Sequence, residues 1–290
     1  MNEQDLKSSI LQLAISGKLV EQREEEGTAK ELLEQVGIKK EQLIKEKKIR
    51  RIKSSGKITE EEIPFDIPDS WEWVRFLDII DVRDGTHDTP KYVSKGIPLI
   101  TSKNLVNGII DFDNIKLISR EDSEDINKRS GVDCGDILFA MIGTIGNPVL
   151  VIKEREFSIK NMALFKTIDS ELFSMEYLLW YLQLEQEAMK RRARGAVQSF
   201  VSLTYLRNYL IPIPPLEEQK RIVTRIEELM PYIEKYGESY YKIEGFNKKF
   251  PEDMQKSILQ YAMKGKLVEQ REEEGTAAEL YKKIQKEKKG

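Results

Sequence analysis

The chain has 290 residues, of which 40 % are hydrophobic and 33 % are charged, with a formal net charge of −3. This composition is typical of a water-soluble globular protein, and because no apolar run approaches the roughly 18 residues of a membrane span, we expect a protein that does not enter a membrane. The presence of a single cysteine favours a reducing compartment, the cytoplasm. The single cysteine, Cys134, and the single histidine, His87, exclude an intrachain disulfide and a zinc site of four Cys and His ligands, and we expect no metal and no cofactor.

A long internal repeat divides the chain. Residues 5–33 recur as residues 253–281, and the thirteen residues from Gly17 to Ala29 return unchanged as Gly265 to Ala277. The offset of 248 residues is far longer than the roughly 20 to 50 residues of a solenoid repeat. The repeat therefore predicts one globular unit bracketed by two copies of a helical connector.

Residues 1–36 hold the first copy of this connector. A helix there is indicated by the spacing of Leu6, Ile10, Leu13 and Ala14, and Gly17 fits its end. Residues 37–62 are highly charged and carry few large apolar side chains. We interpret them as a partly helical linker that ends at Ser54-Ser55-Gly56.

Residues 63–216 have a different pattern, in which β-branched runs alternate with turns. We predict strands in these runs: Val74–Val82, Pro98–Thr101, Gly108–Phe112, Asp136–Met141, Val149–Ile152 and Met162–Ile168. One helix interrupts them, with Ser174 as its N-cap, and extends to about Arg192. Together these elements predict a mixed α/β domain of about 150 residues, which is long enough to bury its own core.

Residues 217–290 begin with the clearest helical signal. The two prolines at 214–215 stop any helix upstream, and the acidic residues 217–218 place negative charge in the first turn of the next one. Large apolar residues then step by four and three positions over three heptads: Ile222, Ile226, Leu229, Ile233, Tyr236, Tyr240 and Ile243. This seam predicts a homodimer interface, with packing onto the chain's own domain as the alternative. Pro231 and Gly237 lie within the run and could kink the helix.

Six stretches carry a family pattern: IPDSWEWVRFLDI (67–79), DGTHDTPKY (84–92), GIPLITSKNLVNGIID (96–111), GDILFAMIGTIGNPVLV (135–151), IPIPPLEEQKRIVTRIEEL (211–229) and SILQYAMKGKLVEQ (257–270). They resemble the specificity (S) subunit of bacterial type I restriction-modification systems. The most specific are PPLEEQKRIV and the repeated SILQ and GKLV blocks. Family members usually hold two target-recognition domains, separated and followed by conserved helical regions. This chain holds one such domain and therefore resembles a half-length form.

The resemblance implies a fold and a function. The implied fold is α+β or α/β, with one mixed α/β target-recognition domain flanked by conserved helical segments that include a long coiled-coil helix. The implied function is recognition of double-stranded DNA without catalysis, as the specificity subunit of a type I restriction-modification complex. The implied partners are DNA methyltransferase (modification) subunits and restriction motor-nuclease subunits. The a/d seam adds a second copy of the chain as a partner, and two copies on a two-fold axis would read a bipartite palindromic site.

Charge indicates that any DNA contact comes from local patches. Residues 64–216 hold 18 Lys and Arg against 22 Asp and Glu, whereas a lone DNA-binding domain is expected to be basic. The candidate contacts form three patches: Lys91, Lys95, Lys103 and Asn104; Lys160 and Asn161; and Arg191, Arg192 and Arg194 with Gln198 and Ser199. Lys and Arg can hold phosphates, while Arg, Asn and Gln can read base edges. For the arginine patch, the alternative is a solvated helix end whose dipole the cations complement.

Two other functions fit parts of the sequence. The main alternative is a coiled-coil adaptor that binds protein rather than DNA, and it would show no sequence-specific footprint on DNA. An enzyme would depend on His87, in the turn-like run DGTHDTP, because no Asn/Asp-Pro-Pro-aromatic site and no Walker A loop are present. We therefore expect a non-catalytic protein. The run Gly143–Gly146 lacks the positive charge of a nucleic-acid clamp, and we expect a β-hairpin turn there.

Overall fold

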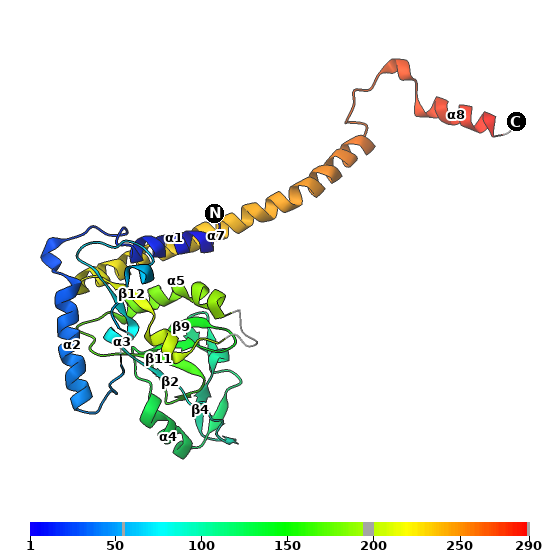
Figure 1. Cartoon of the computed structure of the whole chain (residues 1–290). Coiled ribbons are helices and arrows are strands. Elements are labelled where there is room, and N and C mark those ends of the chain that lie inside the picture. The colour runs from blue at the N-terminus through cyan, green and yellow to red at the C-terminus, as the bar shows by residue number, and fades with distance from the viewer. Residues whose placement is uncertain (54–55, 194–199, 289–290) are drawn as a thin grey trace. The chain divides into compact units, whose positions relative to one another are not determined.

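The structure, a computed structural model, describes residues 1–53, 56–193 and 200–288 (Figure 1). These residues form two compact units, one of Glu3–Ile233 and one that begins at Glu234. The first unit holds α1 (Glu3–Ile15), η1 (Glu24–Glu26), α2 (Ala29–Lys45), η2 (Glu60–Glu62), α3 (Phe76–Ile79), η3 (Ser102–Asn104), α4 (Arg120–Ser130), α5 (Met175–Ala193) and α6 (Leu203–Arg207). Helix α7 (Leu216–Met263) begins in the first unit and continues into the second, which also holds η4 (Glu272–Glu274) and α8 (Ala277–Glu287).

The strands of the first unit are short, and most are antiparallel. They are β1 (Glu72–Arg75), β2 (Ile80–Asp84), β3 (Tyr92–Val93), β4 (Ile97–Ile100), β5 (Leu105–Val106), β6 (Ile109–Ile110), β7 (Lys116–Ile118), β8 (Ile137–Ala140), β9 (Gly146–Leu150), β10 (Ser158–Ile159), β11 (Met162–Thr167) and β12 (Leu210–Ile213). The two larger sheets run β2-β11-β8-β9 and β10-β4-β7-β3, and the pair β10-β4 is parallel. The pairs β1-β12 and β5-β6 complete the strand pairing. The mixed helix-and-sheet architecture confirms the predicted fold class.

The sheet β2-β11-β8-β9 separates two hydrophobic cores. Successive side chains of a strand point to opposite faces, so Phe139 and Phe165 enter the larger core while Leu138 and Leu164 enter the smaller one. All four are fully buried. Because both faces are covered, β8 and β11 carry continuous apolar runs instead of alternating apolar and polar residues.

Helix α5 packs against β9 and closes the larger core (Figure 1). Its buried face contributes Tyr177, Leu178 and Tyr181. The backbone N–H of Tyr177 donates to Ser174 Oγ at 3.2 Å, which confirms Ser174 as the N-cap. The helix therefore begins and ends close to the positions that the sequence predicts.

Three helices inside residues 63–216 contradict the prediction of a single one. Helix α4 has the sequence REDSEDINKRS, which has no apolar stripe, so periodicity could not reveal it. It is capped by Ser119, whose Oγ accepts from Asp122 N, and its buried Ser123 bonds Ser158 Oγ at 2.9 Å. Helix α3 interrupts the strand predicted over 74–82, and α6 precedes β12.

The repeated connector and the linker have regular local structure. Gly17 has φ +69° just beyond α1, as a glycine helix end requires. Helix α2 crosses residue 36, where the sequence predicts the limit of the first copy, so the first residues of the linker are helical. The turn at 143–146 joins antiparallel β8 and β9, which confirms the predicted hairpin.

Helix α7 starts at Leu216, directly after the two prolines, and continues through Pro231 and Gly237 to Met263. Its seam residues have different surroundings. Ile222 and Ile226 are buried in the larger core of their own chain, the alternative that the pattern left open. Ile233 is also buried, whereas Ile243 is 60 % exposed. Leu229 and Tyr240 are half-buried, and Tyr236 is 40 % exposed.

Among the helices of the described residues, none combines the length and the apolar character that a membrane span needs.

Candidate functional site

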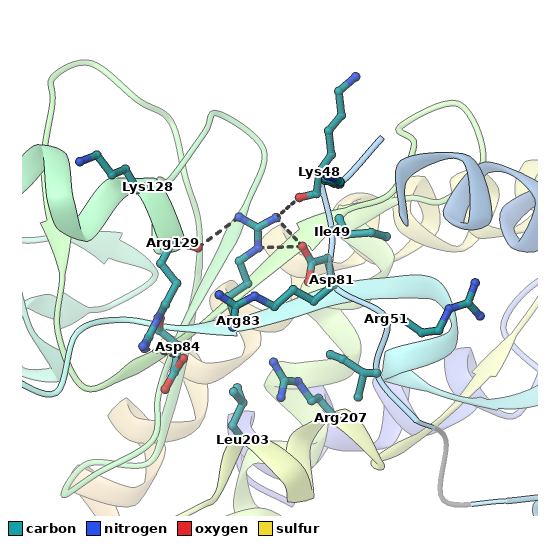
Figure 2. A pocket seen from close by; sticks show the side chains of 13 residues that line it. Lys48, Ile49, Arg51, Asp81, Arg83, Asp84, Lys128, Arg129, Leu203 and Arg207 are labelled. Atoms are coloured by element: carbon teal, nitrogen blue, oxygen red, sulfur yellow. Dashed lines mark hydrogen bonds and ion pairs between the residues drawn. The ribbon is translucent and has the colours of Figure 1, made fainter. Parts of the chain in front are cut away.

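A basic cleft of about 470 Å³ opens on the first unit (Figure 2). The segment after α2, strand β2, the end of α4 and helix α6 all contribute to it. Among the described residues that line it, eight are cationic and two are acidic: Lys47, Lys48, Arg50, Arg51, Arg83, Lys128, Arg129 and Arg207, with Asp81 and Asp84. We call this surface the basic cleft.

Arg83 holds three segments of the basic cleft together. Its guanidinium group donates to Asp81 Oδ2 at 2.7 Å on its own strand, to the Arg129 carbonyl at 3.2 Å and to the Lys48 carbonyl at 3.2 Å (Figure 2). Because these partners belong to three different elements, Arg83 fixes the segment after α2 against β2 and the end of α4. The half-buried guanidinium group of Arg83 therefore positions the main chain around the basic cleft.

Two further arginines, Arg129 and Arg207, line the basic cleft and bond to strand β2 or the residue after it. Arg129 pairs with Asp84 at 2.8 Å and donates to the Gly85 carbonyl at 3.2 Å. Arg207 donates twice to the Val82 carbonyl, at 3.0 and 2.8 Å, and burial lowers the pKa of its guanidinium group. The Asp84 carboxylate therefore compensates the positive charge of Arg129. Arg207 bonds a neutral carbonyl, which uses part of its donor capacity without compensating its charge.

The outer residues of the basic cleft are more accessible. Lys47, Lys48, Arg50, Arg51 and Lys128 are all exposed, and Figure 2 shows Lys48 and Lys128 extending away from Arg83. Ion pairs with residues outside the cleft are made by Lys48 to Glu46 at 2.7 Å, Arg51 to Glu41 at 2.5 Å and Lys128 to Asp125 at 2.7 Å. Exposed pairs of this kind are weak and are screened by salt, so these cations can be recruited by a polyanion.

The chemistry of the basic cleft suits binding of an anion. It offers many Lys and Arg donors and few acidic groups, which is the footprint expected for phosphates. Within the described residues, no group of three or more His, Cys, Asp or Glu side chains is placed to hold a metal ion.

The structure places the first predicted patch around the sheet β10-β4-β7-β3. Lys91 precedes β3, Lys95 lies between β3 and β4, and Lys103 lies in η3; all three are exposed. Asn104 is used by the turn that it occupies. Its Oδ1 accepts from Thr101 N and Oγ1 at 2.9 Å, and its Nδ2 donates to the Asp111 carbonyl at 3.1 Å. The three lysines stay candidates for DNA contact, while the amide of Asn104 has a structural role.

The second patch contacts the loop that contains His87. Lys160 Nζ donates to Thr89 Oγ1, and Asn161 Oδ1 lies 3.2 Å from His87 Nδ1. The other ring nitrogen of His87 lies 2.8 Å from Asp84 Oδ2. Both ring nitrogens therefore have protein partners, which favours the predicted loop role of His87 over a role as catalytic base.

The third patch begins in the last turn of α5. Arg191 and Arg192 are exposed, and the guanidinium carbon of Arg192 lies 4.9 Å from the ring centroid of Tyr205. This cation–π contact gives Arg192 a partner inside the unit. Arg194, Gln198 and Ser199 lie outside the described residues.

The basic cleft is not among the patches that the sequence predicts. Its cations come from residues 47–51, 83, 128–129 and 207, which only the fold brings together. One local signal is present, because KKIRR at 47–51 is a run of four cations around one isoleucine. Such a run usually indicates a solvated linker or a nucleic-acid patch, and within residues 37–62 it fits the linker predicted there.

Comparison with models of known protein families establishes the family of this chain. Residues 68–261 match the model described as the type I restriction modification DNA specificity domain. The chain belongs to this family. The matched range includes Arg83, Arg129 and Arg207 of the basic cleft.

Two curated relatives and one solved structure are similar to this chain. The specificity subunits of the type I restriction enzymes EcoAI and EcoEI from Escherichia coli are 28 % and 26 % identical, and each alignment covers 98 % of this chain. The two alignments cover 55 % and 54 % of the length of those relatives, so this chain spans about half of each. The solved structure of the HsdS subunit from Thermoanaerobacter tengcongensis is 17 % identical, with 91 % of this chain and 59 % of that chain covered and a TM-score of 0.47.

Proposed function

We propose that this type I specificity domain recognises DNA sequence for a restriction-modification complex and performs no catalysis itself. The family match over residues 68–261 is the observation that carries the proposal. The basic cleft supports the proposal. The chain has a formal net charge of −3, so it can bind DNA only where its cations are gathered on one surface, as they are in the basic cleft. DNA methyltransferase subunits and restriction motor-nuclease subunits are the proposed partners.

The basic cleft is proposed to hold DNA phosphates and thereby orient the domain. Its Lys and Arg side chains sit on segments that Arg83 holds together, and phosphate contacts made by such side chains position DNA without sequence preference. Base reading then falls to other parts of residues 63–216, among which Lys91, Lys95 and Lys103 are exposed. The arginines at the end of α5 are further candidates for phosphate contact.

A coiled-coil adaptor that binds protein is the competing function. Methylation mapping separates the two functions, because only a specificity subunit directs methylation to one DNA sequence. The experiment expresses the chain with its methyltransferase partner in a host without other methylases and maps modified bases over the genome. A modification pattern that does not depend on the chain would support the adaptor instead.

The same mapping tests a symmetric assembly. Two identical chains on a two-fold axis must contact identical half-sites in inverted order. We therefore expect the modified sites to form an interrupted palindrome, with the same half-site on both strands. An asymmetric or contiguous recognition site would contradict a homodimer with one recognition domain per chain.

The exposed part of the α7 seam is the proposed homodimer contact. Ile222 and Ile226 already pack in their own chain, so substitutions there would test the fold. Ile243 is 60 % exposed, and we expect Ile243→Asp to convert a dimer into a monomer, because a buried unpaired carboxylate costs several kcal/mol, roughly 3 to 5 in measured cases. Sedimentation velocity at micromolar concentration measures the change. Lys242→Asp, at the exposed neighbouring position, is the control and should stay dimeric.

A further inference from the structure

The two repeat copies adopt the same local structure. Gly17 and Gly265 have φ +69° and +64°, and Gly27 and Gly275 have φ +75° and +71°. In each copy a Gln side chain bonds the carbonyl of the first glycine, Gln22 at 3.3 Å and Gln270 at 3.1 Å. Each copy then starts a helix with a threonine capping box. The second copy is therefore folded in the same way as the first.

The first copy is bound by a surface that we call the repeat seat: Pro68, Ser70, Trp71, Glu218 and Arg221. Gly17 lies so close to the Pro68 ring that a Cβ there would be 2.7 Å from Pro68 Cδ and 3.4 Å from Trp71 Cζ2. The backbone N–H of Ala29 donates to the Ser70 carbonyl at 2.8 Å. Shape and main-chain bonding thus fix the copy on the repeat seat.

Polar groups make the repeat seat specific. Gln22 Nε2 donates to Glu218 Oε1 at 2.5 Å, and its Oε1 accepts from Ser70 Oγ at 3.2 Å. Glu26 forms a bidentate ion pair with Arg221, in which both N···O distances are 2.7 Å. Burial raises the pKa of the Glu218 carboxyl, although the hydrogen bonds from Trp71 and Gln22 oppose that shift.

The second copy carries the same groups in an exposed form. Gln270 and Glu274 correspond to Gln22 and Glu26. Within the described residues, no hydrogen bond or ion pair joins the carboxylate of Glu274 to another side chain. Leu11 is 3 % exposed in the first copy, whereas its equivalent Leu259 is 55 % exposed.

The substitutions between the copies preserve the surface that binds. Ile15 becomes Met263 and Val36 becomes Ile284, so the buried positions of the first copy stay apolar in the second. Both Met263 and Ile284 are exposed. In the first copy these apolar positions are buried in the larger core, where α1 contacts α5 and α2 contacts α3. The second copy therefore carries the apolar face and the polar groups that fit the repeat seat and this adjoining surface.

We propose that the second copy, residues 253–284, binds the repeat seat of a second chain in place of that chain's own first copy. The partner is a second copy of this protein, because its repeat seat already accepts thirteen identical residues. The second copy would make nearly the same interactions on the repeat seat as the first copy that it displaces. The extent of this replacement is therefore set by the effective concentrations of the two copies at the repeat seat. It is independent of DNA and of the proposed function.

Cross-linking between two marked chains tests the exchange. In a Cys134→Ser background, one chain carries Ser70→Cys in the repeat seat and the other carries Gln270→Cys in the second copy. Because Gln22 Oε1 lies 3.2 Å from Ser70 Oγ in the first copy, Gln270 should reach the same position. A short bismaleimide should link the mixed chains into heterodimers, and each variant alone should give none. A chain with both cysteines reports intrachain docking as a linked monomer.

Charge reversal makes the test specific for the repeat. Arg221→Glu should reduce the interchain product several-fold, because both Glu26 and Glu274 then meet a carboxylate. Adding Glu274→Arg should restore the product above the wild-type amount, since only the second copy recovers its ion pair. Adding Glu26→Arg instead should keep it low, because the chain's own first copy recovers the seat.

Three outcomes would overturn the proposal. They are a mixed reaction without heterodimer while the chain is folded by circular dichroism, linkage only within the doubly substituted chain, and equal responses to Glu274→Arg and Glu26→Arg. The variants with Glu274→Arg and with Glu26→Arg carry the same net charge. A general electrostatic effect would therefore change both in the same direction and cannot explain opposite responses.

Discussion

Replacing Lys48, Arg50 and Arg51 with alanine should weaken binding to every DNA sequence, on the order of a hundred-fold at about 0.1 M salt. The three side chains are exposed on the rim of the basic cleft. Each lost phosphate contact lowers the slope of log K against log salt by about 0.9, so the triple variant should be flatter by about 2.7. The fold should persist, because Arg83 holds the carbonyl of Lys48 and not its side chain.

The measurement is a salt titration of DNA affinity with the methyltransferase partner present. A matched control replaces Lys30, Lys57 and Lys220, which are exposed in the same unit and lie outside the basic cleft. This control changes the net charge equally and should retain both affinity and slope. If both triple variants lose affinity equally, the net charge of the chain and not the basic cleft governs binding.

The base preference should be the same in the cleft variant as in the wild type. Phosphate contacts position a protein on DNA and carry no direct sequence information. The sequence motif recovered by methylation mapping should therefore not change, although fewer sites would be modified. A changed sequence motif would mean that residues of the basic cleft read bases, which would contradict a role limited to positioning DNA.

The elements that the sequence predicts well are those with a local signal. Ser174 marks the start of α5, and the prolines at 214–215 mark the start of α7. The strands β8 and β11 are recognisable because burial on both faces leaves continuous apolar runs. Helix α4 has no such signal, since its inward contacts are made by serines.

The burial partner of a periodic face cannot be predicted from periodicity. The α7 seam has one regular spacing, yet Ile226 packs in its own chain and Ile243 is exposed. A spacing of 3.5 residues between apolar positions shows that one face of the helix prefers burial, but it does not show which surface covers that face. The basic cleft was missed for a related reason, because Arg83 and Arg207 are far apart in sequence and meet only through the tertiary fold.

Gly17→Ala should destabilise the first unit by about 2 to 4 kcal/mol, through backbone strain and overpacking together. Gly17 has φ +69°, a left-handed conformation that costs an L-residue about 1 kcal/mol or more. The added Cβ would also lie 2.7 Å from Pro68 Cδ and still closer to Pro68 Cγ, and forcing a methyl group into packed space typically costs about 1 to 3 kcal/mol. Urea unfolding followed by tryptophan fluorescence measures the loss.

Gly265→Ala is the matched control, because the repeat supplies the same glycine outside the first unit. Gly265 has φ +64°, but its added Cβ would meet only the flexible end of the Gln270 side chain, at 3.3 Å. The substitution therefore carries the backbone strain without the clash. All three tryptophans, Trp71, Trp73 and Trp180, lie in the first unit, so their fluorescence transition should not shift in Gly265→Ala. Equal shifts in both variants would mean that the loss of stability in Gly17→Ala does not come from the contact of the first copy with Pro68.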